Sequence, residues 1–414
     1  MQTEKDLKPL SRRQFLRLAP CAPFAGIATA RASFAQMARA EADYPAFSGT
    51  MRLFLAGDVM LGRGIDQILP HPGDPHLFEP STSSALTYLE LAEAANGPIS
   101  RPVDFSYVWG DGLDALEAAR ADARIINLET SITKSTHPDP KGINYKMSPD
   151  NIACLAVLRV DCCSLANNHV LDWGEPGLLE TIESLEAAHI AGVGAGRDAA
   201  QAKAPAILNL AGGAKIVVFG FGIATSGIPK AWSADEDRPG VNFLDRLSAQ
   251  AISAIAAQAR PFRQPGNVLV ASIHWGANWG YDVPDEERYF AHRLIDDAGF
   301  DIIHGHSAHH AKAIEVYRER LILYGCGDFL NDYEGISGYE SFRDDLAVMY
   351  FASCSAAGTL AELKMIPFRI RKFRLQHASK EDALWLKETL DRESTPFGTR
   401  ITLEEDNSLH AKWR

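Results

Sequence analysis

The sequence predicts an α/β protein in which helices cover both faces of the sheet. From residue 50 onward, short apolar runs alternate with polar or glycine-rich turns and helical stretches. The runs span residues 51–58, 123–130, 160–169, 215–222, 267–276, 300–307 and 321–329. Between them, segments 112–121, 174–190 and 285–299 carry apolar residues at the three-to-four spacing of an amphipathic helix. Strands that alternate with such helices are typical of sheets buried on both faces.

The composition is that of a globular protein with an acidic surface. Of the 414 residues, 46% are hydrophobic and 23% charged, which suits one large or two medium domains. The formal net charge is −12, and residues 1–40 hold seven Lys/Arg but two Asp/Glu, so the remainder carries −17. Nucleic acid and anionic membranes are therefore poor partners, because both repel an acidic surface.

The N-terminus resembles a twin-arginine export signal. Residues 11–17 read SRRQFLR, and a weakly hydrophobic stretch, LAPCAPFAGIATA, follows. That stretch is shorter than the roughly 20 residues of a permanent membrane span, and ARA at 38–40 offers a small-residue cleavage site. We predict a signal peptide at residues 1–40, a periplasmic or secreted protein, and transient membrane contact through the signal only. The alternative is a basic N-terminal helix of a cytoplasmic protein.

Residues 50–414 are predicted to form the folded domain. Within it, residues 64–110 are a long insertion rich in Pro, Gly and Ser, and we expect a flap on the substrate side rather than a separate domain. In the C-terminal region, 340–414, segments 345–354 and 359–375 predict two antiparallel strands, 379–394 a helix, and 398–414 a closing hairpin. The five cysteines beyond residue 40 lie mostly in apolar runs, so we expect core residues rather than disulfides.

Six side chains predict a metal site at one edge of the sheet. Each stands at or just past the carboxyl end of a predicted strand, where ligands bind in open α/β sheets because strand ends and loops meet there. They are Asp58, Glu129, Asn168, His274, His306 and His309. Asp328 also ends a predicted strand but is not counted among the ligands. Taken singly, each residue is more often a turn former or a helix cap, so the prediction rests on their joint occurrence.

The donor types indicate which ions this site would hold. Carboxylate and amide oxygens together with imidazole nitrogens suit one or two divalent ions such as Mn, Fe or Zn. A centre of this kind lowers the pKa of a bound water and clamps both oxygens of a displacement.

His169 and Asp172 are the predicted catalytic pair. His169 directly follows Asn168 and would protonate the leaving group, and Asp172, three residues further on, would orient the imidazole and raise its pKa. His304 precedes Gly305, and we expect a packed or supporting histidine there. His310 fits either role.

The chain resembles the CapA family of capsule (poly-γ-glutamate) synthesis proteins, which belongs to the calcineurin-like metallophosphoesterase superfamily. The matching motifs are GDVMLGR (57–63), NLET (127–130), SLANNHVLDWGEPGLLET (164–181), GVGAG (192–196), HWG (274–276), GHSAHH (305–310) and YGCGDFLND (324–332). The resemblance implies a four-layer αββα sandwich, metallophosphoesterase-like, with its ligands on loops at one edge. By position, it implies a first-motif aspartate at Asp58, a bridging carboxylate at Glu129 and a terminal histidine pair at His306 and His309.

Two departures from the superfamily pattern bear on the number of metal ions. The first motif is usually Asp-x-His, but Met60 stands where the histidine is expected. The terminal motif is usually Gly-His-x-His, whereas GHSAH has one more residue between its histidines. These departures imply either a mononuclear site or one weakly held ion beside a firmly held one.

The function that these observations favour is that of an exported, metal-binding CapA-like protein. It would act on or handle an anionic polymer such as poly-γ-glutamate or a cell-surface glycan. If it is an enzyme, the resemblance implies metal-dependent hydrolysis of a phosphoester or an amide. The alternatives are a non-catalytic polymer-binding assembly factor and a periplasmic metallophosphoesterase unrelated to capsule.

Overall fold

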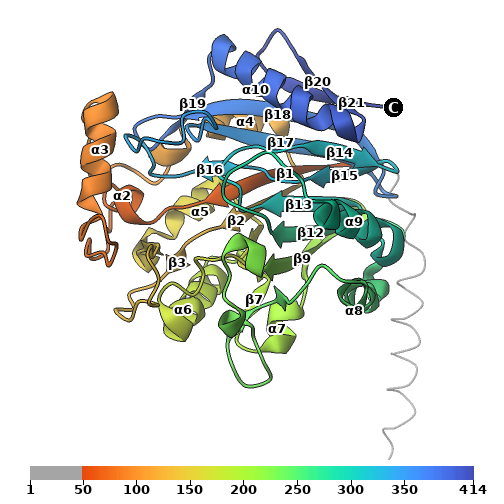
Figure 1. Cartoon of the computed structure of the whole chain (residues 1–414), viewed down its shortest axis with the longest axis horizontal. Helices are drawn as coiled ribbons and strands as arrows, with labels where there is room; N and C mark the ends of the chain where they lie inside the picture. The colour runs from red at the N-terminus through yellow and green to blue at the C-terminus, as the bar shows by residue number, and fades with distance from the viewer. Residues whose placement is uncertain (1–48) are drawn as a thin grey trace, which may run out of the picture. The chain divides into compact units, whose positions relative to one another are not determined.

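Two large β-sheets with helices packed against them form the framework of this protein (Figure 1). The computed structural model describes residues 49–414, and the signal peptide predicted at 1–40 lies outside that range. The mixture of strands and helices confirms the predicted α/β class. Across residues 49–414, no helix combines the length and the apolar character that crossing a membrane requires.

The larger sheet combines a parallel half with an antiparallel half. Its parallel half runs through β1 (Thr50–Val59), β2 (Ala123–Leu128), β5 (Cys162–Ser164) and β6 (Ala191–Val193). On the other side of β1, the antiparallel half runs through β17 (Leu346–Ser355), β18 (Leu360–Ile370), β21 (Leu409–Trp413) and β20 (Thr399–Leu403). Two short strands, β16 (Asp328–Leu330) and β19 (Leu375–His377), pair with β1 and β18.

The smaller sheet carries the histidine-rich strands. Its central strands β9 (Lys215–Ile223), β12 (Asn267–His274), β13 (Ile302–His306) and β15 (Arg320–Leu323) are parallel. The strands at its margins are β8 (Ala206–Asn209), β11 (Phe243–Leu244) and β14 (Ile314–Tyr317).

Alternating side chains divide the core into three parts. In β1, Leu53 belongs to a cluster that joins residues of both sheets, whereas Phe54, the next residue, belongs to a cluster on the opposite face. That face packs against α4 (Gly112–Ala119), α5 (Ala153–Leu158) and α6 (Gly174–Ala187). In β9, Val218 faces the shared cluster and Val217 faces α8 (Ala249–Ala259) and α9 (Asp285–Arg293). Successive strand residues point to opposite faces, so every central strand is buried on both sides.

The predicted strand at residues 321–329 is wrong, because this segment forms two strands in different sheets. β15 belongs to the smaller sheet, and β16 pairs in parallel with β1 of the larger sheet. The chain crosses between the sheets at Gly325–Gly327, where Gly327 has a φ of 76°, a conformation that favours glycine. The crossing could not be predicted from the apolar run, because a buried segment is apolar whichever sheet it belongs to.

The C-terminal region matches the prediction. β17 and β18 are antiparallel, α10 (Lys380–Ser394) follows, and β20 and β21 form the closing hairpin. Helix α10 begins with a capping box, in which Ser379 and Asp382 satisfy each other's backbone N–H groups. The five cysteines are buried and unpaired among residues 49–414, as expected for core residues.

The 64–110 insertion contains secondary structure that its composition did not indicate. It includes α3 (Leu86–Asn96), whose Leu89 and Ala92 are buried in the same cluster as Phe54. A helix that is anchored in the core fixes the position of the chain around it.

The first testable prediction concerns the contact between Gly57 and Gly327. A Cβ atom at position 57 would lie 1.9 Å from the carbonyl oxygen of Gly327, so β1 and β16 would have to separate. We expect Gly57→Ala to lower the free energy of unfolding by about 3 kcal/mol, measured by chemical denaturation. Gly142→Ala is the control, because nothing lies within 4 Å of the added Cβ. Equal stability of the two variants would contradict the close packing of these strands.

Candidate metal centre

Strand register brings the predicted ligands to one edge of the sheets. In the smaller sheet, β12 and β13 end side by side, and His274 lies opposite His306. In the larger sheet, β1 lies between β2 and β16, and Asp58 is in register with Asp328. Carboxylates from one sheet therefore face imidazoles from the other.

The remaining predicted ligands come from the loops that follow these strands. Glu129 directly follows β2, Asn168 lies in the loop after β5, and His309 lies in the loop after β13. All six predicted residues lie in one region of the structure, although 251 positions separate the first from the last.

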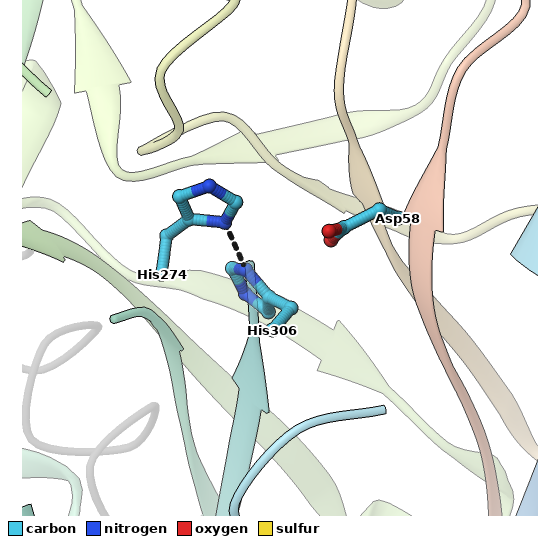
Figure 2. A group of neighbouring side chains, drawn as sticks. All are labelled: Asp58, His274 and His306. Carbon is cyan, nitrogen blue, oxygen red and sulfur yellow. Dashed lines mark hydrogen bonds between the residues drawn. The ribbon is translucent and has the colours of Figure 1, made fainter. Parts of the chain in front are cut away.

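A first group of possible metal ligands consists of Asp58, His274 and His306. One donor atom from each lies within 4.8 Å of the others, and all three residues are buried. Figure 2 shows the Asp58 carboxylate turned toward the two rings, whose Nδ1 atoms lie 2.8 Å apart. The side-chain oxygen of Asn168 lies 3.1 Å from Nε2 of His274, so an amide oxygen borders the group.

A second group shares Asp58 and consists otherwise of Glu129, His309 and Asp328. Its four donor atoms also lie within 4.8 Å of one another, and Nδ1 of His309 is 2.9 Å from an oxygen of Asp328. Because Asp58 belongs to both groups, the two groups of possible ligands lie side by side and share one carboxylate.

Burial and mutual repulsion make the carboxylates hard to ionise. Burial raises the pKa of Asp58 to about 7, and the neighbouring Asp328 contributes to the rise. Burial and then Asp58 raise the pKa of Glu129 well above its usual value. Asp58 and Glu129, buried close together, therefore need either protons or a nearby cation, and a divalent ion would meet that need.

The imidazoles respond to their surroundings in two ways. Burial lowers the pKa of His274 and His306 well below the usual value, so both rings are neutral and able to bind a metal through nitrogen. Burial alone would also lower the pKa of His309, but the carboxylates of Asp328 and Asp58 raise it.

Neighbouring side chains hold the donor atoms in place. Asn127 donates a hydrogen bond to one oxygen of Asp58 at 2.7 Å, which helps to fix the orientation of that carboxylate. Ser272 contacts Nε2 of His306 at 2.9 Å, so Nδ1 of that ring is left to face His274 and Asp58. Supports of this kind orient metal ligands in proteins, so the residues present fit a metal centre.

The second group of possible ligands does not need a histidine at position 60. Met60 is buried, and its sulfur accepts a hydrogen bond from the backbone N–H of Gly62. The carboxylate of Asp328 enters the second group, so that group keeps four donors without Met60. Asp328 is the residue that sequence reasoning passed over, although Gly327-Asp328 repeats the Gly57-Asp58 pair that ends β1.

The additional residue in GHSAH is absorbed by an unusual backbone conformation. Ser307 has a φ of 107°, which side-chain-bearing residues rarely adopt. Its backbone N–H donates to the second oxygen of Asp58 at 3.3 Å. The turn at Ser307 is compatible with His309, rather than residue 308, contributing the second ring.

The other two histidines of the cluster have structural contacts. His304 contacts the carbonyl oxygen of Ala56 at 2.9 Å through Nε2 and the hydroxyl of Ser272 at 3.1 Å through Nδ1. His310 accepts a hydrogen bond from the backbone N–H of Gly280. Neither ring belongs to the two ligand groups found within residues 49–414.

His169 and Asp172 lie in direct contact. Nδ1 of His169 is 2.7 Å from an oxygen of Asp172, and its Nε2 lies 4.0 Å from Glu129. The expected rise in the pKa of His169 is not found. Burial lowers this pKa well below its usual value, and the ammonium group of Lys141 lowers it further, because both disfavour the charged ring.

Sequence reasoning also missed two neighbours of His169. Lys141 donates to Asp172 at 2.7 Å and to the carbonyl oxygen of Asn168. The ring of Tyr145 stacks on His169 with centroids 3.8 Å apart. Both come from the connection that precedes β4 (Lys146–Met147), where no motif or strand end gave a signal.

A cavity of about 410 Å³ opens beside the metal ligands. Its walls come from the insertion, from the connection before β4 and from the loops that follow β12, β13 and β16. The lining residues are Arg63, Ser81, Tyr88, Lys141, Ile143, Tyr145, Asn168, His169, Asn278, Trp279, His309, Tyr333, Ile336, Tyr339 and Asp344. A substrate in this cavity would reach Asn168, His169 and His309 together.

Comparison with known proteins identifies relatives over most of the chain. Two relatives from Mycobacterium tuberculosis strains, both named probable polyglutamine synthesis accessory protein, are 46% identical over 360 residues, which cover 86% of this chain and 94% of theirs. The PGA biosynthesis protein CapA of Bacillus subtilis is 27% identical over 359 residues, or 85% of this chain and 80% of the relative.

A solved structure and a family model complete the comparison. The structure, described as GAP50, the anchor in the inner membrane complex of Plasmodium, covers 83% of this chain and 96% of its own at 8% identity and a TM-score of 0.30, too low to establish a shared fold. The family model described as bacterial capsule synthesis protein PGA_cap matches residues 52–333, which is more than half of the chain. This protein therefore belongs to the PGA_cap family of bacterial capsule synthesis proteins.

Proposed function

We propose that this protein is an exported, metal-dependent hydrolase that acts on a phosphoester or an amide during the biosynthesis or processing of a capsule. Membership of the PGA_cap family and the names of its relatives support the role in capsule formation. The SRRQFLR segment, which lies outside the described residues, supports export.

The observation that carries the proposal is the pair of ligand groups that share Asp58. His274, His306 and Asn168 would hold one ion, and Glu129, His309 and Asp328 would hold the other, with Asp58 common to both. Mn, Fe or Zn suits this mixture of oxygen and nitrogen donors. When bound, such ions supply Lewis acidity and make water a better nucleophile near neutral pH.

The proton transfers are assigned to His169. Asp172 would fix the ring through Nδ1, and Tyr145 would hold its plane by stacking, so that Nε2 is the atom that gives or takes a proton at the cleft. Lys141 would hold the other oxygen of Asp172 by donating a hydrogen bond to it.

We also propose that the fold is a four-layer αββα sandwich of the metallophosphoesterase type. The core that joins both sheets, and the helices packed on their opposite faces, support this arrangement.

A second candidate is a non-catalytic polymer-binding assembly factor. The name of the Mycobacterium relatives, accessory protein, favours it, because an accessory role requires no turnover. The same metal centre would then stabilise the fold or bind the polymer.

The second prediction concerns metal stoichiometry. Asp328→Asn and His306→Ala should each reduce the metal content of the purified protein from two ions to about one, because each residue belongs to a single ligand group. Asp58→Asn should weaken both sites. The measurement is metal analysis by mass spectrometry, and His189→Asn, at an exposed position with φ of 59° that asparagine tolerates, is the control. A wild-type protein that binds no divalent ion would refute the centre.

The third prediction separates catalysis from metal binding. With Mn²⁺ present, the protein should hydrolyse bis(p-nitrophenyl) phosphate, and His169→Gln should lower kcat by about 100-fold while metal content stays unchanged. The control is again His189→Asn, which should retain full activity. Bound metal without hydrolysis under Mn, Fe or Zn would support the assembly factor instead.

The fourth prediction concerns pH. Because the pKa of Asp58 is raised from 3.8 to about 7, the folded carboxyl group keeps a proton below that pH, and a cation must displace it. The affinity for Mn²⁺ should therefore reach its maximum above about pH 7. Below that pH, it should fall by about tenfold per pH unit for each displaced proton. Calorimetric titration at about pH 5.5, 6.5 and 7.5 measures this dependence. A pH-independent affinity would show that no ligand carries a proton in the metal-free protein.

A further inference from the structure

We propose that the cavity beside the metal centre takes a phosphorylated sugar, with the phosphate at the metal ligands and a neutral sugar ring against an aromatic wall. A polycarboxylate chain such as poly-γ-glutamate suits this cavity less well. The inference rests on the proposed function and specifies the substrate class of the same site.

The aromatic wall is built by two loops from different sheets. Trp279, in the loop between β12 and α9, stacks on Tyr339, in the loop between β16 and β17, with ring centroids 4.1 Å apart and planes 9° from parallel. The ring centroids of Trp279 and His309 lie 5.2 Å apart, so the aromatic wall adjoins a proposed metal ligand. Flat aromatic rings offer a surface on which the C–H face of a sugar ring packs well.

Apolar side chains of the cavity are exposed to solvent. Ile143, Ile336 and Tyr339 have exposed fractions of 42%, 37% and 39%, and all three line the cavity. Nine large hydrophobic side chains in the described chain are exposed to this degree, and a third of them gather here. Such a concentration marks a surface that is covered when a ligand binds.

The cations of the cavity are already neutralised. The Lys and Arg residues among its lining are Arg63 and Lys141. Arg63 is buried and forms ion pairs with Asp332 and Glu79. Its guanidinium nitrogen lies 3.2 Å from a carboxylate oxygen of Glu79.

The pairing of Lys141 completes the charge balance of the walls. Lys141 pairs with Asp172 at 2.7 Å, and Asp344 adds a further carboxylate to the lining. A chain with one carboxylate per residue would find no free counter-charge among these described walls and would be repelled by Asp344. A ligand with one anionic group at the metal ions and an uncharged remainder avoids that cost.

The size and polar groups of the cavity also suit a sugar. Its volume of about 410 Å³ is within the range of small-molecule sites and has room for one or two sugar rings. Asn278 and Ser81 are exposed polar residues in the lining, and Tyr333 places its hydroxyl 2.8 Å from that of Tyr145. These groups can exchange hydrogen bonds with sugar hydroxyls.

The experiment compares three ligands by calorimetry with the Mn²⁺-loaded protein. They are the phosphonate analogue of glucose 1-phosphate, which cannot be hydrolysed at its C–P bond, methylphosphonate, and tri-γ-glutamate. We expect the sugar phosphonate to bind roughly five- to tenfold more tightly than methylphosphonate, because the ring packs on the wall. Tri-γ-glutamate should bind no more tightly than methylphosphonate.

Variants of Tyr339 test the wall itself. Tyr339→Ala should bring the ratio of the two phosphonate affinities close to one, whereas Tyr339→Phe, which keeps the ring, should preserve the ratio. Neither variant should change metal content. The matched control is Tyr289→Ala, at a tyrosine on α9 that is 55% exposed and does not line the cavity.

The outcomes distinguish this inference from the proposed function. If methylphosphonate does not bind the metal-loaded protein, the phosphoester form of the proposed function fails and the inference fails with it. If methylphosphonate binds but the sugar ring adds no affinity, or if tri-γ-glutamate binds most tightly, the inference alone is overturned.

Discussion

The parallel pairing of β1 with β16 is the contact on which the candidate metal centre depends. Gly57 lies so close to Gly327 that a Cβ atom at position 57 would clash with the carbonyl oxygen of Gly327, and the backbone N–H of Asp58 donates to that same oxygen at 3.0 Å. This contact sets Asp58 beside Asp328. Without it, the carboxylates would not converge, and the histidines of the smaller sheet would face an incomplete set of donors.

Burying several carboxylates close together costs free energy, and this cost determines which partners the site would favour. Asp58, Glu129 and Asp328 are all buried, and burial raises the pKa of the first two because an isolated charge is poorly solvated there. The smaller sheet contributes neutral imidazoles from His274 and His306, which add donor atoms without adding repulsion. Negative oxygens from one sheet and neutral nitrogens from the other would together favour a divalent cation over protons as the pH rises.

The candidate metal ligands form the floor of the cavity, and this floor differs from the cavity walls in charge. The floor is acidic and suited to cations, whereas the walls present aromatic rings and charges that are already paired, such as Lys141 with Asp172. This division separates two tasks: the floor would hold the reacting group, and the walls would select what is attached to it.

The sequence by itself determined the α/β class, the C-terminal strands and hairpin, and the convergence of six polar residues. These follow from local patterns, because an apolar run that ends in Asp58 or His306 already shows which end of a strand is polar. The tertiary structure alone decided that residues 321–329 cross between the sheets, that Asp328 joins the possible ligands, and that burial and then Lys141 lower the pKa of His169. Strand register and burial depend on segments far apart in the chain, so a local pattern carries no record of them.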